Sequence, residues 1–187
     1  MAVMNQIRPL YRIFENGFTE DDIANIPVPK MDQAEVGAAD VGEQGVRENI
    51  RISKTGWIYN EHLLMYLYKF VNQANMEAFQ TDVNMWADIQ YTVYEGGAKG
   101  HYDWHTDVMF NGIKEMDRKL SVTVQLTDGS EYEGGDFEIL DAGPMPPAIK
   151  KKGTVLIFPS YLQHRVTPVT SGTRKSLVAW FEGPHWR

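Results

Sequence analysis

The spacing of apolar residues changes from a helical to a strand-like period near residue 86. Before that point, apolar residues recur every three to four positions between residues 63 and 74, which predicts an amphipathic helix. A shorter helix is predicted after Thr19, because this N-cap and the three acidic residues that follow it complement the helix dipole. Residues 31–48 are predicted to form a loop or an edge strand. The apolar face of the longer helix comprises Leu63, Leu64, Leu67, Phe70, Val71 and Ala74.

Beyond residue 86, apolar and polar residues alternate in short segments rich in β-forming residues. Turn signals separate these segments, among them Asp128-Gly129 and Ser171-Gly172. Helices therefore come first and strands follow, without strand–helix–strand alternation. This order predicts a mainly β fold of the α+β class, an antiparallel sandwich or barrel with helices packed on one side. The predicted strands are 89–94, 120–126, 136–140, 153–159 and 174–181.

The composition is that of one globular domain over residues 1–187, with a helical support region at about 10–80 and a β core at about 86–183. The net charge of −7 gives no strong nucleic-acid or membrane signal. The absence of cysteine excludes disulfides and thiolate metal sites. We see no signal peptide and no apolar run long enough to cross a bilayer, so we expect a cytoplasmic protein. The sequence does not predict the oligomeric state.

Two overlapping His-X-Asp triplets, His101/Asp103 and His105/Asp107, stand close together. Residues i and i+2 of an extended chain point to the same side, so either pair can supply two metal ligands. His164 follows an apolar strand and can supply a third. Two histidines and one carboxylate form the facial triad of non-haem Fe(II) enzymes, which leaves coordination positions open. The spacing alone prefers neither pair.

Two other histidines are weaker candidates for a metal site. His62 decorates the predicted helix, where a histidine is ordinarily a surface residue. His185 lies two residues from the end of the sequence, and terminal segments fray. We therefore expect neither residue to be a ligand.

Arg174 lies ten residues after His164, on the last predicted strand. By alternation it shares a face with Ser176, Val178 and Trp180. If that face is buried, the guanidinium needs an anionic partner. A small dicarboxylate would pair with it bidentately. The ordinary alternative is an arginine at the rim of the fold that forms a salt bridge within the protein.

Taken in order, these motifs resemble those of the Fe(II)- and 2-oxoglutarate-dependent dioxygenases. The similar branch is the prolyl 4-hydroxylase-like one, which includes the microbial PKHD-type hydroxylases. It has a tyrosine, a glycine and an aromatic residue before His-X-Asp, then Tyr-X-Gly-Gly with an acidic residue, and a distal histidine followed by Val-Thr-Pro-Val-Thr and a basic residue. The resemblance covers about residues 10–183. The matching positions are Tyr94, Gly97, Tyr102, His105, Asp107, 132–136, His164, 166–170 and Arg174.

The resemblance implies a double-stranded β-helix, or jelly roll, in which His105, Asp107 and His164 bind Fe(II) and act in catalysis through the iron. It selects the second triplet because the family has an aromatic residue three positions before the metal histidine. Tyr102 occupies that position, whereas the corresponding position before His101 is alanine. His101 and Asp103 would then either form a hydrogen bond to one of the metal-binding residues or lie on a surface that faces the substrate.

The resemblance also implies that Arg174, aided by Tyr94 or Ser176, binds the distal carboxylate of the cosubstrate 2-oxoglutarate. This chain carries two more residues than usual between Tyr94 and Tyr102, so Tyr91 is the alternative to Tyr94. The implied reaction uses dioxygen, with ascorbate as a candidate reductant. It hydroxylates an unactivated C–H bond and converts 2-oxoglutarate to succinate and CO₂.

The expected substrate is a prolyl or other residue in a peptide or protein. One alternative is a free amino acid or small metabolite, and another is a nucleic acid, which the net acidity disfavours. A cupin-like metal-binding isomerase or binding module is the alternative from a different class, but it would not explain Arg174 ten residues after His164. By the same resemblance, specificity is expected in the loops at about 30–56, 108–118 and 141–152.

Overall fold

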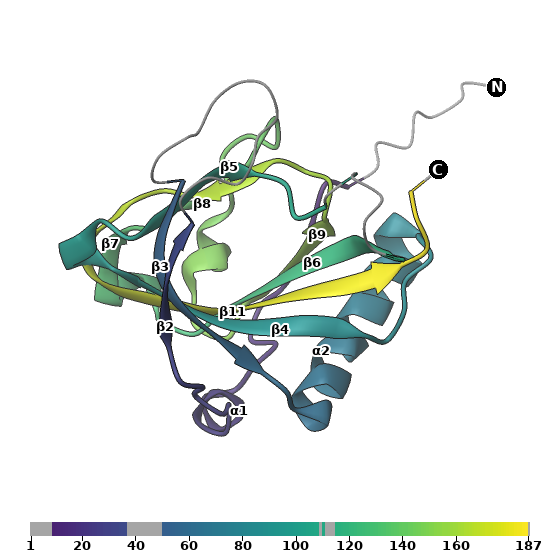
Figure 1. The fold of residues 1–187 in the computed structure, drawn as a ribbon, viewed down its shortest axis with the longest axis horizontal. Coiled ribbons are helices and arrows are strands. Elements are labelled where there is room, and N and C mark those ends of the chain that lie inside the picture. The colour runs from purple at the N-terminus through teal and green to yellow at the C-terminus, as the bar shows by residue number, and fades with distance from the viewer. Residues whose placement is uncertain (1–8, 37–49, 109, 111–114, 187) are drawn as a thin grey trace.

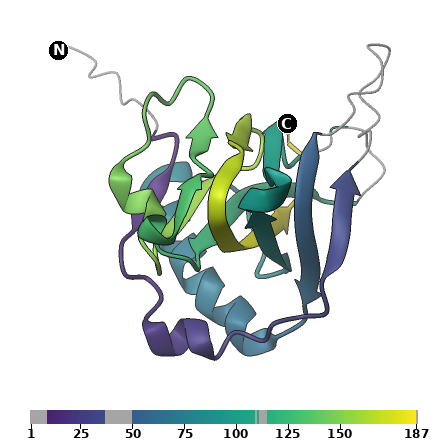
Figure 2. The ribbon, with the colours of Figure 1, turned by 90° about the vertical axis from the view of Figure 1, so that its left-hand side faces the viewer.

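One curled, antiparallel sheet organises the chain, and two helices lie on one side of it (Figures 1 and 2). The computed structural model describes residues 9–36, 50–108, 110 and 115–186. The helices are α1 (Glu20–Ala24) and α2 (Glu61–Ala74), and short helical turns occur at Asn75–Phe79, Gly96–Ala98, Gly129–Glu131 and Pro147–Lys150. The strands are β1 (Arg12–Phe14), β2 (Asp32–Val36), β3 (Arg51–Ile58), β4 (Ala87–Glu95), β5 (His101–His105), β6 (Asp117–Gln125), β7 (Tyr132–Gly134), β8 (Phe137–Ile139), β9 (Val155–Pro159), β10 (His164–Val166) and β11 (Val169–Gly183).

The strand order along the sheet is β1-β9-β6-β11-β4-β3-β5-β10-β8, with β2 paired to β3 and β7 paired to β11. Every one of these pairs is antiparallel. The sheet curls so that β5, β10 and β8 lie across from β6, β11 and β4 (Figure 1). The predicted antiparallel β architecture is therefore confirmed.

Both predicted helices are present, and their caps explain where they begin. Thr19 and Asp22 form a reciprocal capping box at the start of α1. Asn60 accepts a hydrogen bond from the main-chain N–H of Leu63 at 2.9 Å and starts α2. The predicted apolar face of α2 packs against the sheet, with Leu64 only partly buried. Its buried members are Leu63, Leu67, Phe70, Val71 and Ala74.

The helical support region expected at about residues 10–80 contains, besides its helices, strands β1, β2 and β3. β3 lies inside the sheet between β4 and β5, so this region completes the sheet as well as supporting it. Charged residues and Gly56 interrupt the alternation along β3, which is why its sequence does not signal a strand. The edge strand expected within residues 31–48 is β2, and residues 37–49 lie outside the described residues.

The prediction of a turn at Ser171-Gly172 is wrong, because both residues lie within β11. Gly172 has a φ of 72°, and a Cβ atom there would lie 2.2 Å from the carbonyl oxygen of Glu131. Glycine adopts this left-handed conformation without steric cost. It allows β11 to change partners, from β7 before Gly172 to β4 and β6 after it.

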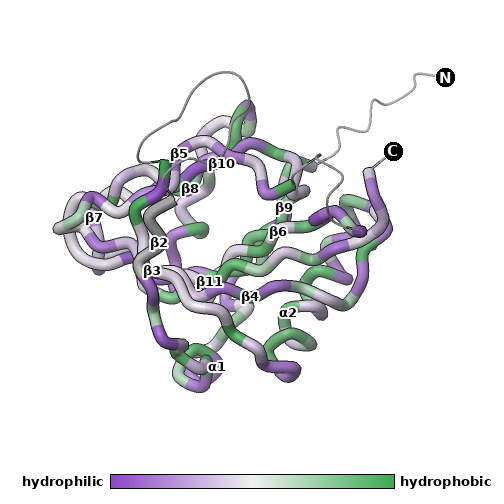
Figure 3. Tube along the Cα trace, viewed as in Figure 1, coloured by the Kyte–Doolittle hydropathy of each residue, from purple (hydrophilic) through white to green (hydrophobic). Residues whose placement is uncertain are grey.

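The two faces of the central strands β4, β6 and β11 differ in polarity. On one face, apolar residues such as Ile89, Val122 and Leu177 pack with α2 into the larger core. Figure 3 shows apolar segments in β6, β9 and α2. The opposite face lies inside the curl of the sheet and is buried but mostly polar. Its buried polar residues include Gln90, Thr92, Ser121, Thr123, Gln125, Arg174 and Ser176.

No helix in the described part of the chain is both long enough and apolar enough to span a bilayer.

We expect Leu67→Ala to lower the free energy of unfolding by about 2–5 kcal/mol, because Leu67 is 0% exposed and its removal leaves a cavity between α2 and the sheet. Met65→Ala on the same helix is the control. Met65 is 51% exposed, so its replacement is expected to change stability by less than about 0.5 kcal/mol. Urea unfolding measures both, and equal losses would contradict the packing of α2 described above.

Candidate active site

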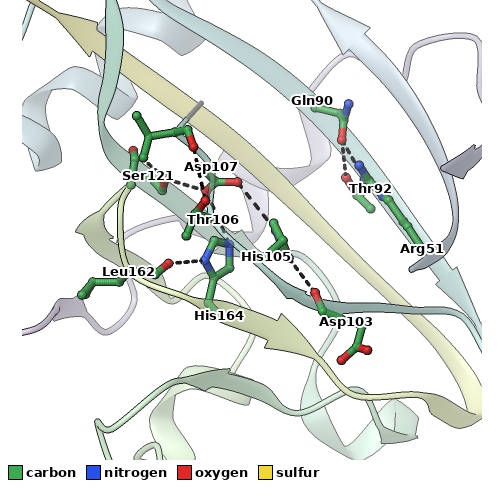
Figure 4. Close-up of polar contacts among 12 residues, drawn as sticks. Arg51, Gln90, Thr92, Asp103, His105, Thr106, Asp107, Ser121, Leu162 and His164 are labelled. Atoms are coloured by element: carbon green, nitrogen blue, oxygen red, sulfur yellow. Dashed lines mark hydrogen bonds and ion pairs between the residues drawn. The ribbon is translucent and has the colours of Figure 1, made fainter. Parts of the chain in front are cut away.

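Three of the predicted ligands meet inside the curl of the sheet. His105 ends β5, and Asp107 follows two residues later. β10 pairs with β5 so that His164 lies opposite His105. One ligand atom from each of the three residues lies within 4.8 Å of the other two. Figure 4 shows the three side chains converging.

Main-chain carbonyl groups fix the orientation of both imidazoles. The Nδ1 atom of His105 lies 2.7 Å from the carbonyl oxygen of Asp103, and that of His164 lies 2.9 Å from the carbonyl oxygen of Leu162. A carbonyl can only accept, so each Nδ1 carries the hydrogen and each Nε2 keeps its lone pair. The two Nε2 atoms lie 3.7 and 3.4 Å from the carboxylate oxygens of Asp107. This donor set fits Fe(II) held by a facial triad.

Asp107 is buried, and its carboxylate is held in place from the central sheet. The hydroxyl of Ser121 on β6 donates to its Oδ2 atom at 2.6 Å, and the hydroxyl of Ser160 lies 2.9 Å from that of Ser121. Burial by itself would raise the pKa of Asp107. The nearby imidazoles of His164 and His105 and the Ser121 hydrogen bond outweigh it and hold this pKa below its usual value. The carboxylate is therefore ionised at neutral pH.

His105 is held in its neutral form. Burial is the main cause, and the neighbouring His164 adds to it, so that the pKa of His105 falls to about 3. The ring of Tyr102 stacks on the imidazole, with 3.4 Å between ring centroids and 10° between planes. Burial also raises the pKa of Tyr102 to about 12, so this ring stays neutral as well. A neutral imidazole can bind a metal without first losing a proton.

Arg174 faces the same cavity as the three ligands. It is only 3% exposed, and no carboxylate pairs with it among the residues that the structure describes. Its Nη1 atom donates to the Ser176 hydroxyl at 3.4 Å, and its guanidinium lies 5.5 Å from the centre of the Tyr94 ring. Gly135 makes room for it, since a Cβ there would lie 3.0 Å from the Arg174 Cδ. A buried cation of this kind favours an anionic ligand.

The two tyrosine alternatives lie on opposite faces of β4. Tyr94 is paired with Arg174 in the sheet register and lines the cavity. Tyr91 belongs to the core on the side of the helices. The cavity therefore brings Tyr94, and not Tyr91, beside Arg174.

The other histidine candidates lie apart from the three ligands. The Nδ1 atom of His101 is 2.8 Å from the carbonyl oxygen of Lys99, and Asp103 contacts His105 through its main-chain carbonyl (Figure 4). His62 is exposed on α2. The Nδ1 atom of His185 lies 3.3 Å from the carboxylate of Asp117, and His185 is not part of the ligand cluster.

Three further residues at the site were not assigned a role from the sequence. Arg51 is 8% exposed, donates to Gln90 at 2.8 Å and lies over the Tyr102 ring at 4.7 Å. Ser121 orients Asp107. Trp180 has a buried indole N–H without a partner among the described residues. The alternation of polar residues on β6 was an available signal for Ser121, whereas the role of Arg51 depends on its contacts with Gln90 and Tyr102. Of the expected specificity loops, residues 37–49, 109 and 111–114 lie outside the described residues.

Comparison with known sequences identifies similar proteins. The family model of the 2OG-Fe(II) oxygenase superfamily matches residues 89–182. A PKHD-type hydroxylase from Synechococcus sp. (strain CC9311) is 44% identical over 94 residues. That match covers 50% of this chain and 40% of the relative, so the chain spans less than half the length of the relatives of this kind that it matches.

Comparison with solved structures shows the same fold. A prolyl-4-hydroxylase from Pseudomonas putida has a TM-score of 0.67 at 18% identity, covering 94% of both chains. A Trichoplax adhaerens prolyl hydroxylase, in complex with a hypoxia inducible factor oxygen degradation domain peptide fragment, has a TM-score of 0.64 at 15% identity, covering 92% of this chain and 83% of that chain. The fold expected from the resemblance, a double-stranded β-helix with helices on one sheet, is confirmed.

We expect Asp107→Ala to weaken the binding of Mn(II) by more than about 100-fold, because residues that merely orient a ligand already contribute about 10- to 100-fold. Ser121→Ala, which removes only the orienting hydroxyl, is expected to fall within that smaller range. His62→Ala on the exposed face of α2 is the control and should bind like the wild type. Isothermal titration calorimetry measures all four proteins, and unchanged affinity in Asp107→Ala would exclude this metal centre.

The metal-free protein is expected to lose about 2 kcal/mol of its free energy of unfolding between pH 7.5 and pH 5 through His105. The pKa of His105 is about 3 in the folded state and about 6.5 in the unfolded chain, so only the unfolded chain takes up a proton in this range. The pKa of Asp107 is lowered, so its contribution is lost only below about pH 4.

Replacing His105 with asparagine removes the titrating group, so the dependence of stability on pH should flatten by the same amount. Urea unfolding in a chelating buffer at the two pH values tests this. An equally steep dependence in His105→Asn would show that His105 is not held neutral.

Proposed function

The chain belongs to the 2OG-Fe(II) oxygenase superfamily, and from this premise we propose that it is a 2-oxoglutarate-dependent dioxygenase that hydroxylates an unactivated C–H bond. The proposal rests on the surroundings of Arg174. Its guanidinium is buried in the cavity of the metal ligands and has no carboxylate partner in the described part of the chain. The distal carboxylate of 2-oxoglutarate supplies the missing charge, and the Ser176 hydroxyl and Tyr94 flank the same position.

His105, Asp107 and His164 would hold the iron. When bound, Fe(II) would supply the activation of dioxygen that the protein's own side chains cannot provide. One oxygen atom enters the substrate as a hydroxyl group, and the other enters succinate as C1 of 2-oxoglutarate leaves as CO₂. Ascorbate is the proposed reductant that returns oxidised iron to the ferrous state.

The protein contributes orientation and a shielded cavity to this reaction. The carbonyl groups of Asp103 and Leu162 keep both Nε2 atoms directed to one point. Arg174 lies on β11, across the curl of the sheet from β5 and β10, so it would orient 2-oxoglutarate with its keto acid end toward the ligands. Phe137 and Phe158 complete the walls of the cavity with apolar surface. Fixed geometry of this kind lowers the entropic part of the barrier.

We propose a prolyl residue in a peptide or protein as the substrate. This proposal is supported by the proteins that the chain resembles. The similar sequences are PKHD-type hydroxylases, and the similar structures from Pseudomonas and Trichoplax are prolyl hydroxylases, the latter with a bound peptide fragment. A single catalytic domain over residues 1–187 and a cytoplasmic location belong to the same proposal.

We expect Arg174→Ala to weaken the binding of 2-oxoglutarate by about 30-fold or more, since truncating one partner of a buried charge pair costs about 2–5 kcal/mol. Mn(II) affinity should not change, because Arg174 is not a ligand. Lys175→Ala is the matched control: it removes an exposed charge from the next position of β11. Calorimetry with the Mn(II)-loaded protein under anaerobic conditions measures the binding.

The iron-loaded wild type should also release succinate from 2-oxoglutarate and add 16 mass units to a member of a proline-containing peptide library. A product among free amino acids instead would move the substrate to the alternative class. If no mixture supports succinate release and Arg174→Ala binds 2-oxoglutarate like the wild type, the proposed function is wrong, and a cupin-like binding protein becomes the better description.

A further inference from the structure

Strand β8 is an edge of the sheet with unpaired main-chain groups. Leu140 donates to Gln163 at 2.9 Å, and Thr167 donates to Asp136 at 2.9 Å, so the even-numbered residues of this segment bond to β10. Hydrogen-bonding directions alternate along an antiparallel strand, so the main-chain groups of Phe137 and Ile139 point away from β10. The carbonyl of Ile139 accepts from Ala142. The N–H and C=O of Phe137 and the N–H of Ile139 have no hydrogen-bond partner among the described residues.

A groove runs along this free edge. Its strand side is formed by residues 136–141, and its opposite wall by residues 143–150, with Trp104 contributing from β5. Met145 and Ile149 on that wall pack against the same apolar cluster as Phe137. An edge strand beside an apolar groove is the arrangement to which an extended peptide can add as a further strand.

The groove is acidic. Three carboxylates line it, against one lysine. Asp136 lies 2.6 Å from Lys150, and Glu138 lies 2.7 Å from Arg165, so these two are paired. Asp141 is exposed and forms no ion pair among the described residues, which leaves an excess of negative charge for a ligand to meet. A basic segment complements this charge.

The groove adjoins the metal cavity. Phe137 lines both, and its ring lies 5.5 Å from that of His164 with 28° between the planes. A peptide strand added to β8 would lie about 4.8 Å from it, on the side away from β10. A bound segment would therefore lie one strand away from the strand that carries a metal ligand.

We propose that the free edge of β8 binds an extended, basic segment of the polypeptide substrate by strand addition. This inference rests on the proposed function in that the polypeptide is the hydroxylated one. In an antiparallel arrangement, the residue opposite Phe137 exchanges two main-chain hydrogen bonds with it, and Ile139 donates a third. The side chain of that residue lies on the same face as Phe137, beside Met145 and Ile149, and is apolar. Its neighbours along the peptide lie on the side of Glu138 and are basic.

The test uses the full chain with zinc in place of iron and the octapeptide acetyl-(Lys-Val)₄-amide as the probe. Amide exchange is followed by NMR. Without peptide, Phe137 and Ile139 are expected to exchange fast, whereas Glu138, bonded to β10, is already protected. With saturating peptide, exchange at Phe137 and Ile139 should slow by about tenfold or more, since both amides gain partners.

Main-chain recognition is separated from side-chain recognition by two N-methylated peptides of equal charge. Only the valine N–H groups face β8 in the proposed register, so methylation of the valine nitrogens should abolish binding, whereas methylation of the lysine nitrogens should leave it. Asp141→Asn should weaken binding about two- to fivefold, as expected for one exposed charge pair. Asp32→Asn, which removes the same charge from β2, should not.

The proposal is overturned if the octapeptide does not bind at millimolar concentration, if it binds without slowing exchange at Phe137 and Ile139, or if both methylated peptides bind equally. Protection that appears with protein concentration alone would assign the edge to a second copy of the chain and also overturn it. None of these measurements requires turnover. If the octapeptide binds at β8 but the iron-loaded protein releases no succinate, the proposed function is wrong. If succinate is released but the octapeptide does not bind at β8, only the proposal of strand addition is wrong.

Discussion

The structure depends on the burial of both faces of the central strands β4, β6 and β11. Their apolar faces pack on α2, and this burial supplies the main driving force for folding. Their polar faces are enclosed by the curl of the sheet, where water cannot satisfy them freely. Each buried polar group there needs a partner from the protein or from a ligand. Groups with a partner inside the protein form the scaffold of the site. Groups without such a partner form its binding positions.

Asp107 and Arg174 illustrate the two outcomes. The carboxylate of Asp107 accepts a hydrogen bond from Ser121, so its position beside the Nε2 atoms of the two histidines is fixed. Arg174 finds a hydroxyl and a tyrosine ring but no carboxylate in the described chain. The first residue is thus held ready to bind a metal, and the second is held ready to bind an anion. Both conditions follow from placing charged residues inside the curl of the sheet.

Local patterns were sufficient to predict the parts of the site that lie within one strand or turn. The His-X-Asp spacing and the alternation around Arg174 indicated the ligands and the inward face, although the choice of His105 over His101 required the family resemblance. Arg51 and Ser121 were missed because their roles depend on contacts with residues far away in the sequence. β3 was missed because its pairing with β4 and β5, and not its own alternation, holds it in the sheet. At Ser171-Gly172 the glycine does adopt a left-handed conformation, but it lies inside strand β11 and not in a turn between two strands.

The distribution of charge between the surface and the cavity has a kinetic consequence. The chain as a whole carries a net charge of −7, whereas the cavity contains two buried arginines, Arg51 and Arg174, against one carboxylate, Asp107. A small dianion is therefore repelled at long range and attracted only once it enters the cavity. Salt shortens the range of the repulsion more than it weakens the buried contact. Entry of such a ligand should accordingly become faster as ionic strength rises, the reverse of electrostatic steering by an attractive surface.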